Sequence, residues 1–319
     1  MIAAAVLLAV SGAAMLLAAG FPDFAEWYSQ NIYPLLTGSL GRVSGFVPFS
    51  VSEVGIYTLL AAFFITLFLT VRDMLKGKGS RALVSWLSGV LLAAGILAFL
   101  YTACCGINYH RRSFSEEEGI VTYNYSADEL KEICIWLTEE VNARADEVSR
   151  DGQGVMELDA PEEEGGVSAM YRLAEEFPSL QGYYPRPKEL LLSEVLSYQS
   201  LTGIYLPFTV EANFIAFLAC VGSERMDFQY SGYLSGWVYC MNAPYRADYE
   251  SWEEVRILLD EAAEPDLTAN SEFWNRYEGP VAETAERIND AYLKVNGQAD
   301  GVQSYDRMVD LIVAYFGGQ

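Results

Sequence analysis

Residues 82–107, ALVSWLSGVLLAAGILAFLYTACCGI, decide the fold of the first third of this chain. The stretch carries no charged side chain and is about as long as a helix that crosses the ~30 Å hydrocarbon layer of a bilayer. A buried core helix is the alternative for any single run of this kind. Two further uncharged runs, residues 54–71 and 2–20, precede it. Three such runs in succession predict a membrane domain at residues 1–112 with three transmembrane helices.

The first run, Ile2–Gly20, has a second interpretation as a cleaved signal sequence, because it ends in the small residues Ala18, Ala19 and Gly20. It lacks the Lys or Arg that normally precedes the apolar part of a signal peptide. An uncleaved span is therefore favoured. Cleavage would leave two spans and the same orientation for the rest of the chain.

The basic residues predict the orientation. Four of them crowd the short stretch 72–81 between the second and third spans, which should therefore be cytoplasmic. The segment Phe21–Glu53 carries only Arg42 as a cation and is rich in Trp and Tyr, so we expect an ordered interfacial loop on the outside. Arg111 and Arg112 argue weakly the other way. The chain is thus expected to be a multi-pass cell-membrane protein whose C-terminal domain is extracytoplasmic.

The C-terminal domain, residues 113–319, is strongly acidic. It holds 39 of the 43 Asp and Glu residues but only 13 of the 20 Lys and Arg residues. A surface of this charge repels nucleic acid, which excludes that partner class, and it attracts cations and basic peptides. The expected partners are the lipid bilayer and a peptide or envelope protein.

The domain is expected to be all-α. Ser126–Glu129 forms a capping box that opens a helix with an apolar stripe from Leu130 to Val141. No strand-like alternation is present. Further helices are predicted at Val167–Phe177, Lys188–Leu201, Val210–Val221, Asp227–Asn242, Ser251–Ala263, Asn270–Lys294 and Tyr305–Phe316.

A series of short motifs runs along the chain in a fixed order, and together they resemble a bacterial membrane family, the domain-of-unknown-function family 3810. Each motif alone is weak, but their joint presence covers nearly the whole chain. They are Val47–Glu53 (VPFSVSE), Gly106–Arg112 (GINYHRR), Tyr184–Pro187 (YPRP), Ser193–Ser197 (SEVLS), Thr202–Thr209 (TGIYLPFT), Glu211–Ala216 (EANFIA), Tyr230–Tyr233 (YSGY), Asn289–Lys294 (NDAYLK), Asn296–Gln298 (NGQ) and Gly301–Tyr305 (GVQSY).

The resemblance implies a zinc site that this chain cannot build. In the family, the loop matching Thr202–Thr209 continues into Glu-Ala-Asn, a helix of the His-Glu-x-x-His type follows, and a second Glu-Ala-Asn opens the helix matching Phe214–Cys220. Such members look like zincins, in which two histidines and a downstream glutamate hold zinc and the motif glutamate activates water. Here one Glu-Ala-Asn stands where two are expected, and His110 is the only histidine. The resemblance therefore implies a zincin-like remnant that lost its metal helix in frame.

Glu211 has two interpretations. It is either a remnant metal ligand, since it occupies the place of the family's third ligand, or a solvated carboxylate that complements the dipole of the helix it opens. The second is favoured because no histidine is near. We assign no catalytic residue and no cofactor to this chain, although zinc is implied for the family.

Four residues are candidates for lining a peptide groove: Tyr205, Asn213, Tyr230 and Tyr233. For the tyrosines, packing against apolar neighbours is the favoured alternative.

Three functions follow. The leading hypothesis is a membrane-anchored, catalytically inactive family member that retains binding. An active membrane zinc metallopeptidase is the alternative if the missing segment belongs to the gene product. A structural or binding protein of the cell envelope is the third. Loss of a helix also predicts that the apolar face of the Val210–Val221 helix, which includes Phe214 and Phe217, lacks its natural cover. The domain should then be marginal or oligomeric unless neighbouring helices close over the gap.

Overall fold

The computed structural model describes residues 1–44, 51–159, 162–181, 211–247, 249–276, 279–296 and 307–317. Within these ranges the chain forms helices and no strand, with one isolated bridge between Arg150 and Met156, so the expected all-α fold is confirmed. The described chain divides into two compact units. Residues 1–111 and 285–296 form the first, and residues 112–181, 211–284 and 307–317 form the second. The predicted domains, 1–112 and 113–319, stay a prediction.

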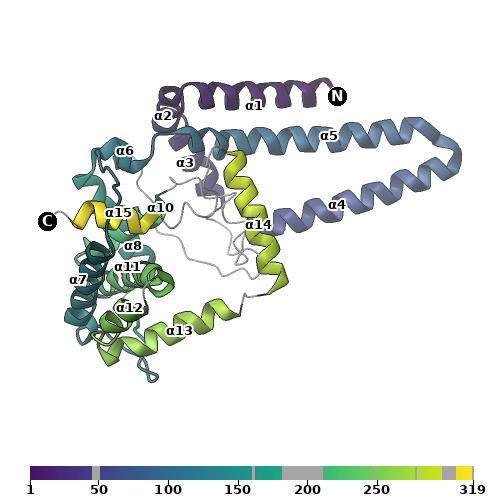
Figure 1. Ribbon diagram of the computed structural model, residues 1–319. Coiled ribbons are helices and arrows are strands. Elements are labelled where there is room, and N and C mark those ends of the chain that lie inside the picture. The colour runs from purple at the N-terminus through teal and green to yellow at the C-terminus, as the bar shows by residue number, and fades with distance from the viewer. Residues whose placement is uncertain are drawn as a thin grey trace. The chain divides into compact units, whose positions relative to one another are not determined.

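Three helices of the first unit are long and apolar enough to cross a membrane: α1 (Ile2–Gly20), α4 (Val51–Asp73) and α5 (Gly79–Cys104). In Figure 1, α4 and α5 form a long hairpin. Large apolar side chains cover their outer surfaces, and Phe64 and Phe68 are 63% and 69% exposed. Such a surface suits lipid and not water. The helices agree with the three predicted runs, except that residues 106–110 form a separate 3-10 helix, η2 (Gly106–His110).

Small residues let α1 and α5 approach closely. Ala4 and Ser11 of α1 are buried, and a Cβ atom added to Gly95 of α5 would lie 3.2 Å from the carbonyl oxygen of Ala4. Close backbone contact of this kind is a usual source of helix association in membranes. The other pair, α4 and α5, is joined by a hydrogen bond in which Trp86 Nε1 donates to Thr66 Oγ1 at 3.1 Å.

The segment after the first span is helical, which corrects the expected loop. It forms α2 (Pro22–Asn31) and α3 (Tyr33–Ser44). Pro22 and Pro34 both lie in the first turn of a helix, where proline is tolerated because that turn needs no backbone donor. The Tyr28 hydroxyl donates to the carbonyl oxygen of Ala103 at 2.8 Å and so fastens α2 to the end of α5.

The helices of the second unit pack around one core. Two capping boxes open its first helices. Ser113 and Glu116 cap the first helix, and Ser126 and Glu129, as predicted, cap the second. Its helices are α6 (Phe114–Glu118), α7 (Ala127–Ala145), α8 (Glu162–Glu176), η3 (Pro178–Leu180), α10 (Ala212–Val221), α11 (Met226–Ala247), α12 (Tyr249–Arg256), η4 (Glu261–Ala263), α13 (Glu264–Asn275) and α15 (Arg307–Phe316).

Two predicted helices are broken in the structure. The stretch Ser251–Ala263 divides after α12, because Asp260 caps a new turn through its bond to the Ala262 amide at 2.8 Å. The stretch Asn270–Lys294 divides into α13 and α14 (Pro280–Val295) at Gly279, whose φ of +133° favours glycine. The predicted helix Lys188–Leu201 lies outside the described residues.

The apolar face of α10 is covered by neighbouring helices, so the predicted exposure of this face is wrong and the alternative, closure by neighbouring helices, describes the structure. Phe214 and Phe217 are 0% and 3% exposed. The covering helices are α8, α11 and the C-terminal α15, which lies beside α10 in Figure 1. Aromatic contacts close the face: the Phe214 ring meets that of Tyr315 at 6.1 Å, and the Phe217 ring meets that of Phe316 at 5.9 Å.

Candidate functional site

Glu211 lies at the N-cap of α10, and its side chain is fully buried. Its carboxylate accepts two hydrogen bonds from one residue of α6: Ser115 N donates to Oε2 at 2.7 Å and Ser115 Oγ donates to Oε1 at 2.6 Å. Arg307 at the start of α15 brings its Nε to 3.5 Å from Oε1. The carboxylate thus joins α6, α10 and α15.

This environment corrects the favoured interpretation of Glu211 as a solvated carboxylate. The carboxylate leaves water because two donors and a cation replace its hydration. Each of its two oxygens accepts one hydrogen bond from Ser115. Among the residues that the structure describes, no group of three or more His, Cys, Asp or Glu side chains could hold a metal. A ligand role for Glu211 is not tested by this geometry.

His110, the only histidine of the sequence, lies in η2 of the first unit, and Glu211 lies in the second unit. Burial lowers the pKa of His110, which favours the neutral imidazole.

Three of the four predicted groove residues lie in the described part of the chain, and Tyr205 lies outside it. Tyr230 is fully buried and therefore lines no open surface. Tyr233 is half-buried; its ring packs edge-on against Trp136 at 5.8 Å, with the Arg144 guanidinium 4.4 Å from its centroid. Asn213 Nδ2 approaches the Tyr239 hydroxyl at 3.4 Å. Packing, the favoured alternative for the tyrosines, describes Tyr230 and Tyr233 well.

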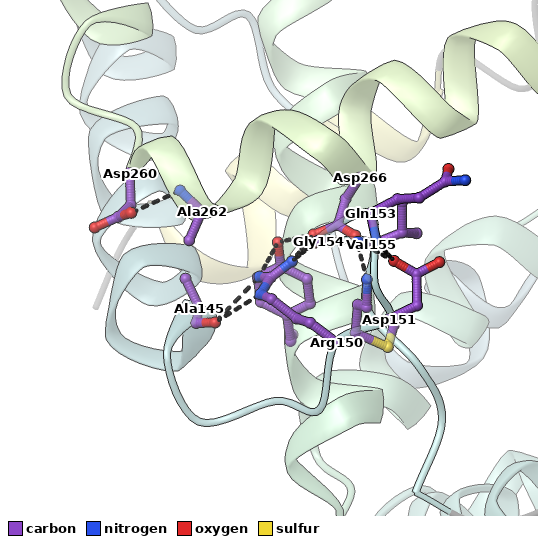
Figure 2. Close-up of polar contacts among 11 residues, drawn as sticks. Ala145, Arg150, Asp151, Gln153, Gly154, Val155, Asp260, Ala262 and Asp266 are labelled. Carbon is purple, nitrogen blue, oxygen red and sulfur yellow. Dashed lines mark hydrogen bonds and ion pairs between the residues drawn. The ribbon is translucent and has the colours of Figure 1, made fainter.

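Tyr230 instead takes part in a buried polar network with Arg150 and Asp266, which Figure 2 shows in part. Asp266 Oδ2 accepts from the Tyr230 hydroxyl at 2.5 Å and from Arg150 at 2.8 Å. Arg150 also donates to the carbonyl oxygens of Ala145 and Gly154. Burial, followed by the hydrogen bond to Asp266, raises the pKa of Tyr230, so the hydroxyl stays protonated.

The same network fixes the loop after α7 onto α13. Asp151 Oδ1 accepts from the amides of Gln153 and Val155 at 2.8 and 2.9 Å, and Gly154 has a φ of +84°. The Met156 amide then donates to Asp266 Oδ1 at 2.7 Å. Both carboxylate oxygens of Asp266 thus accept hydrogen bonds from within the protein, which gives this arrangement a structural role.

A second network surrounds Asp227, which is 0% exposed. It accepts from Arg225 Nε, the Asp159 amide and the Phe228 amide, each within 3.0 Å. Burial alone would raise the pKa of Asp227, but these donors outweigh it and hold the pKa below its usual value. Sequence reasoning missed both networks, because no local motif links Arg150 to Asp266 or Asp159 to Asp227.

The chain is similar to one protein family. The model described as "Protein of unknown function (DUF3810)" matches residues 28–213 and 210–313. The two matched stretches share residues 210–213, Val-Glu-Ala-Asn. No curated protein and no solved structure matches the chain significantly.

Proposed function

This chain belongs to the DUF3810 family of unknown function, and from that premise we propose that it is a membrane-anchored member that lacks the family's metal-binding segment and acts by binding, without hydrolysing peptides. The partners proposed are the lipid bilayer and a peptide or protein of the cell envelope.

One observation carries the proposal. Residues 210–213 serve both matched stretches, as the end of the first and the start of the second. A match divided in this way is the outcome expected when a segment between two similar Glu-Ala-Asn copies has been lost. The lost segment would be the helix that bears both histidines, and a chain with one histidine cannot build a site that needs two on one helix.

The packing around the junction supports a stable short form. Glu211 bonds with Ser115 and Arg307, and the helix that it opens is covered by α15. These contacts support a second unit whose core is closed without an additional helix.

The apolar helices support the membrane part of the proposal. The basic stretch 72–81 favours a multi-pass arrangement with the link between α4 and α5 in the cytoplasm and the acidic second unit outside.

The test combines metal content with stability. The purified full chain in detergent should contain well under one zinc per chain by elemental analysis, and the variant Glu211→Ala should leave that value unchanged. Glu211→Ala should lower the free energy of unfolding by about 1–3 kcal/mol, because the buried donors of Ser115 lose their acceptor, whereas Glu211→Gln should cost less. Stoichiometric zinc that disappears in Glu211→Ala would overturn the proposal.

The divided match also favours a second candidate, an active membrane zinc metallopeptidase whose metal helix is missing from this sequence. Sequencing the locus across Val210–Phe214 separates the two. A recovered His-Glu-x-x-His segment would establish the peptidase candidate, and an unchanged junction would eliminate it.

A further inference from the structure

A seven-residue extended segment stands out in the helical second unit. Residues 120–126, Ile-Val-Thr-Tyr-Asn-Tyr-Ser, lie between α6 and α7 and form no helix, turn or bend. The chain therefore passes through them without a sharp change of direction. Ile, Val, Thr and Tyr are the residues that favour strands, yet the described part of this unit contains no sheet for them to join.

The segment is held at both ends. The Ile120 amide donates to the Ser115 carbonyl at 2.8 Å, and the Tyr125 hydroxyl donates to Asp310 Oδ1 at 2.9 Å. Ile120 and Tyr125 pack against the core, while Val121 and Tyr123 are 78% and 44% exposed. Contacts with the core thus hold both ends of the segment in place.

The backbone between these anchors is unpaired. Within the described chain, no main-chain amide or carbonyl group of Val121–Tyr125 makes a hydrogen bond to another protein group. An exposed strand with unpaired main-chain groups is a template on which a second extended chain can pair.

Acidic residues border the segment on both sides. Glu116, Glu117 and Glu118 precede it, and Asp128, Glu129 and Glu132 follow it. Hydrogen bonds from the Ser126 amide and hydroxyl lower the pKa of Glu129, so its carboxylate is charged at neutral pH. Lys131 is the only cation between Ser113 and Glu132, and it is paired with Glu254.

We propose that residues 120–125 bind an extended peptide with basic residues near its ends, which pairs with them as an added β-strand. The proposal rests on the binding function proposed above and names the class of partner. A second copy of the same segment is disfavoured, because either strand direction would bring the acidic ends of one copy against the acidic ends of the other.

The first experiment measures binding of a fluorescent peptide, Lys-Thr-Val-Thr-Val-Thr-Lys, to the full chain in detergent. N-methylation of amides on one edge of the peptide should weaken binding at least tenfold, and N-methylation on the other edge should leave it unchanged, because strand pairing uses alternate amides. A peptide with Glu in place of both Lys residues should bind at least tenfold more weakly. Absent binding, or equal affinity of all methylated peptides, would overturn the proposal.

The second experiment changes the protein. Thr122→Pro and Tyr123→Pro remove neighbouring amides that point to opposite sides of the strand. Only one of these variants should lose binding tenfold or more, while both keep the melting temperature. If both variants bind the peptide as tightly as the unchanged chain, the proposal is wrong. It is also wrong if the chain does not bind the peptide but forms dimers as its own concentration rises. A negative result for peptide binding does not change the expected zinc content, so the two proposals can be rejected separately.

Discussion

Asp266 shows how a single buried carboxylate can hold a loop, a tyrosine and an arginine together. It accepts from Met156, Tyr230 and Arg150, and its side chain is only 8% exposed. Buried charges persist where they are paired and fully hydrogen-bonded, and removing one partner leaves the other uncompensated.

We therefore expect Asp266→Ala to lower the free energy of unfolding of the second unit by about 3–5 kcal/mol. Tyr230→Phe removes one neutral donor and should cost about 1 kcal/mol. Urea titration followed by circular dichroism measures both values. Glu272→Ala, an exposed change on the same helix, is the control and should stay within about 0.5 kcal/mol. An Asp266→Ala variant as stable as this control would contradict the structural role.

A second residue-scale prediction concerns pH. The donors around Asp227 hold its folded-state pKa below the unfolded value of 3.8. Its contribution to stability is therefore complete above that value and is lost as the pH falls through the lower folded-state pKa.

In Asp227→Asn this contribution is absent at every pH. The melting temperature of the unchanged chain should therefore fall more steeply than that of the variant as the pH is lowered from about 5 to about 2. Parallel curves for the two proteins would show that Asp227 does not titrate in this way.

At the scale of elements, the pairing of α1 with α5 depends on the absence of side-chain atoms. Gly95 leaves room for the backbone of α1 at Ala4, whereas a Cβ atom added to Gly89 on the same helix would meet nothing within 4 Å. The two glycines thus form a matched pair.

Gly95→Leu should separate the helices and destabilise the first unit by about 1–3 kcal/mol, as overpacking does elsewhere. Gly89→Leu should leave stability nearly unchanged. Thermal unfolding of each variant in detergent, with light scattering as a check on aggregation, makes the comparison. Equal melting temperatures would show that the two helices do not pack at Gly95.

The C-terminal helix α15 is a second element whose packing matters for the stability of its unit. Leu311, Ile312 and Val313 of α15 are fully buried and help to close the core over α10. Burial of each such side chain contributes roughly 1.5–3 kcal/mol, against roughly 5–15 kcal/mol for the net stability of a typical domain. This helix of ten residues thus contributes substantially to the core of the second unit.

At the scale of the whole molecule, charge and hydropathy are segregated along the chain. The net charge is −23, and nearly all acidic residues follow the three apolar helices. This asymmetry motivates the proposed topology, with the basic link inside and the acidic unit outside.

The expected outcome of a topology map is that Leu75→Cys resists a membrane-impermeant maleimide added to intact cells, whereas Gln153→Cys reacts. Both positions are exposed, and Cys104 and Cys220 are changed to serine to lower the background. Gly165 is unsuited to labelling, because a Cβ atom there would lie 2.5 Å from Arg225 Nη1. The reverse labelling pattern would invert the orientation.

Several features could be predicted because they depend on neighbouring residues or on composition. The uncharged runs set the length of α1, α4 and α5, and the spacing of Ser126 and Glu129 set the start of α7. The breaks within the predicted helices were harder to predict. The sequence pattern gave no clear end at Asp260 or Gly279, whereas the helices of the structure end near these residues.

The sequence by itself determined the helical class, the three apolar helices and the lack of a two-histidine metal helix, since these follow from local pattern and residue content. Only the tertiary structure decided the place of Glu211, the burial of Tyr230 and the cover of α10. The reason is separation along the chain: Ser115 and Glu211 are 96 residues apart, and Arg150 and Asp266 are 116 apart. Whether a carboxylate is solvated or buried depends on which distant donors the packed helices bring to it.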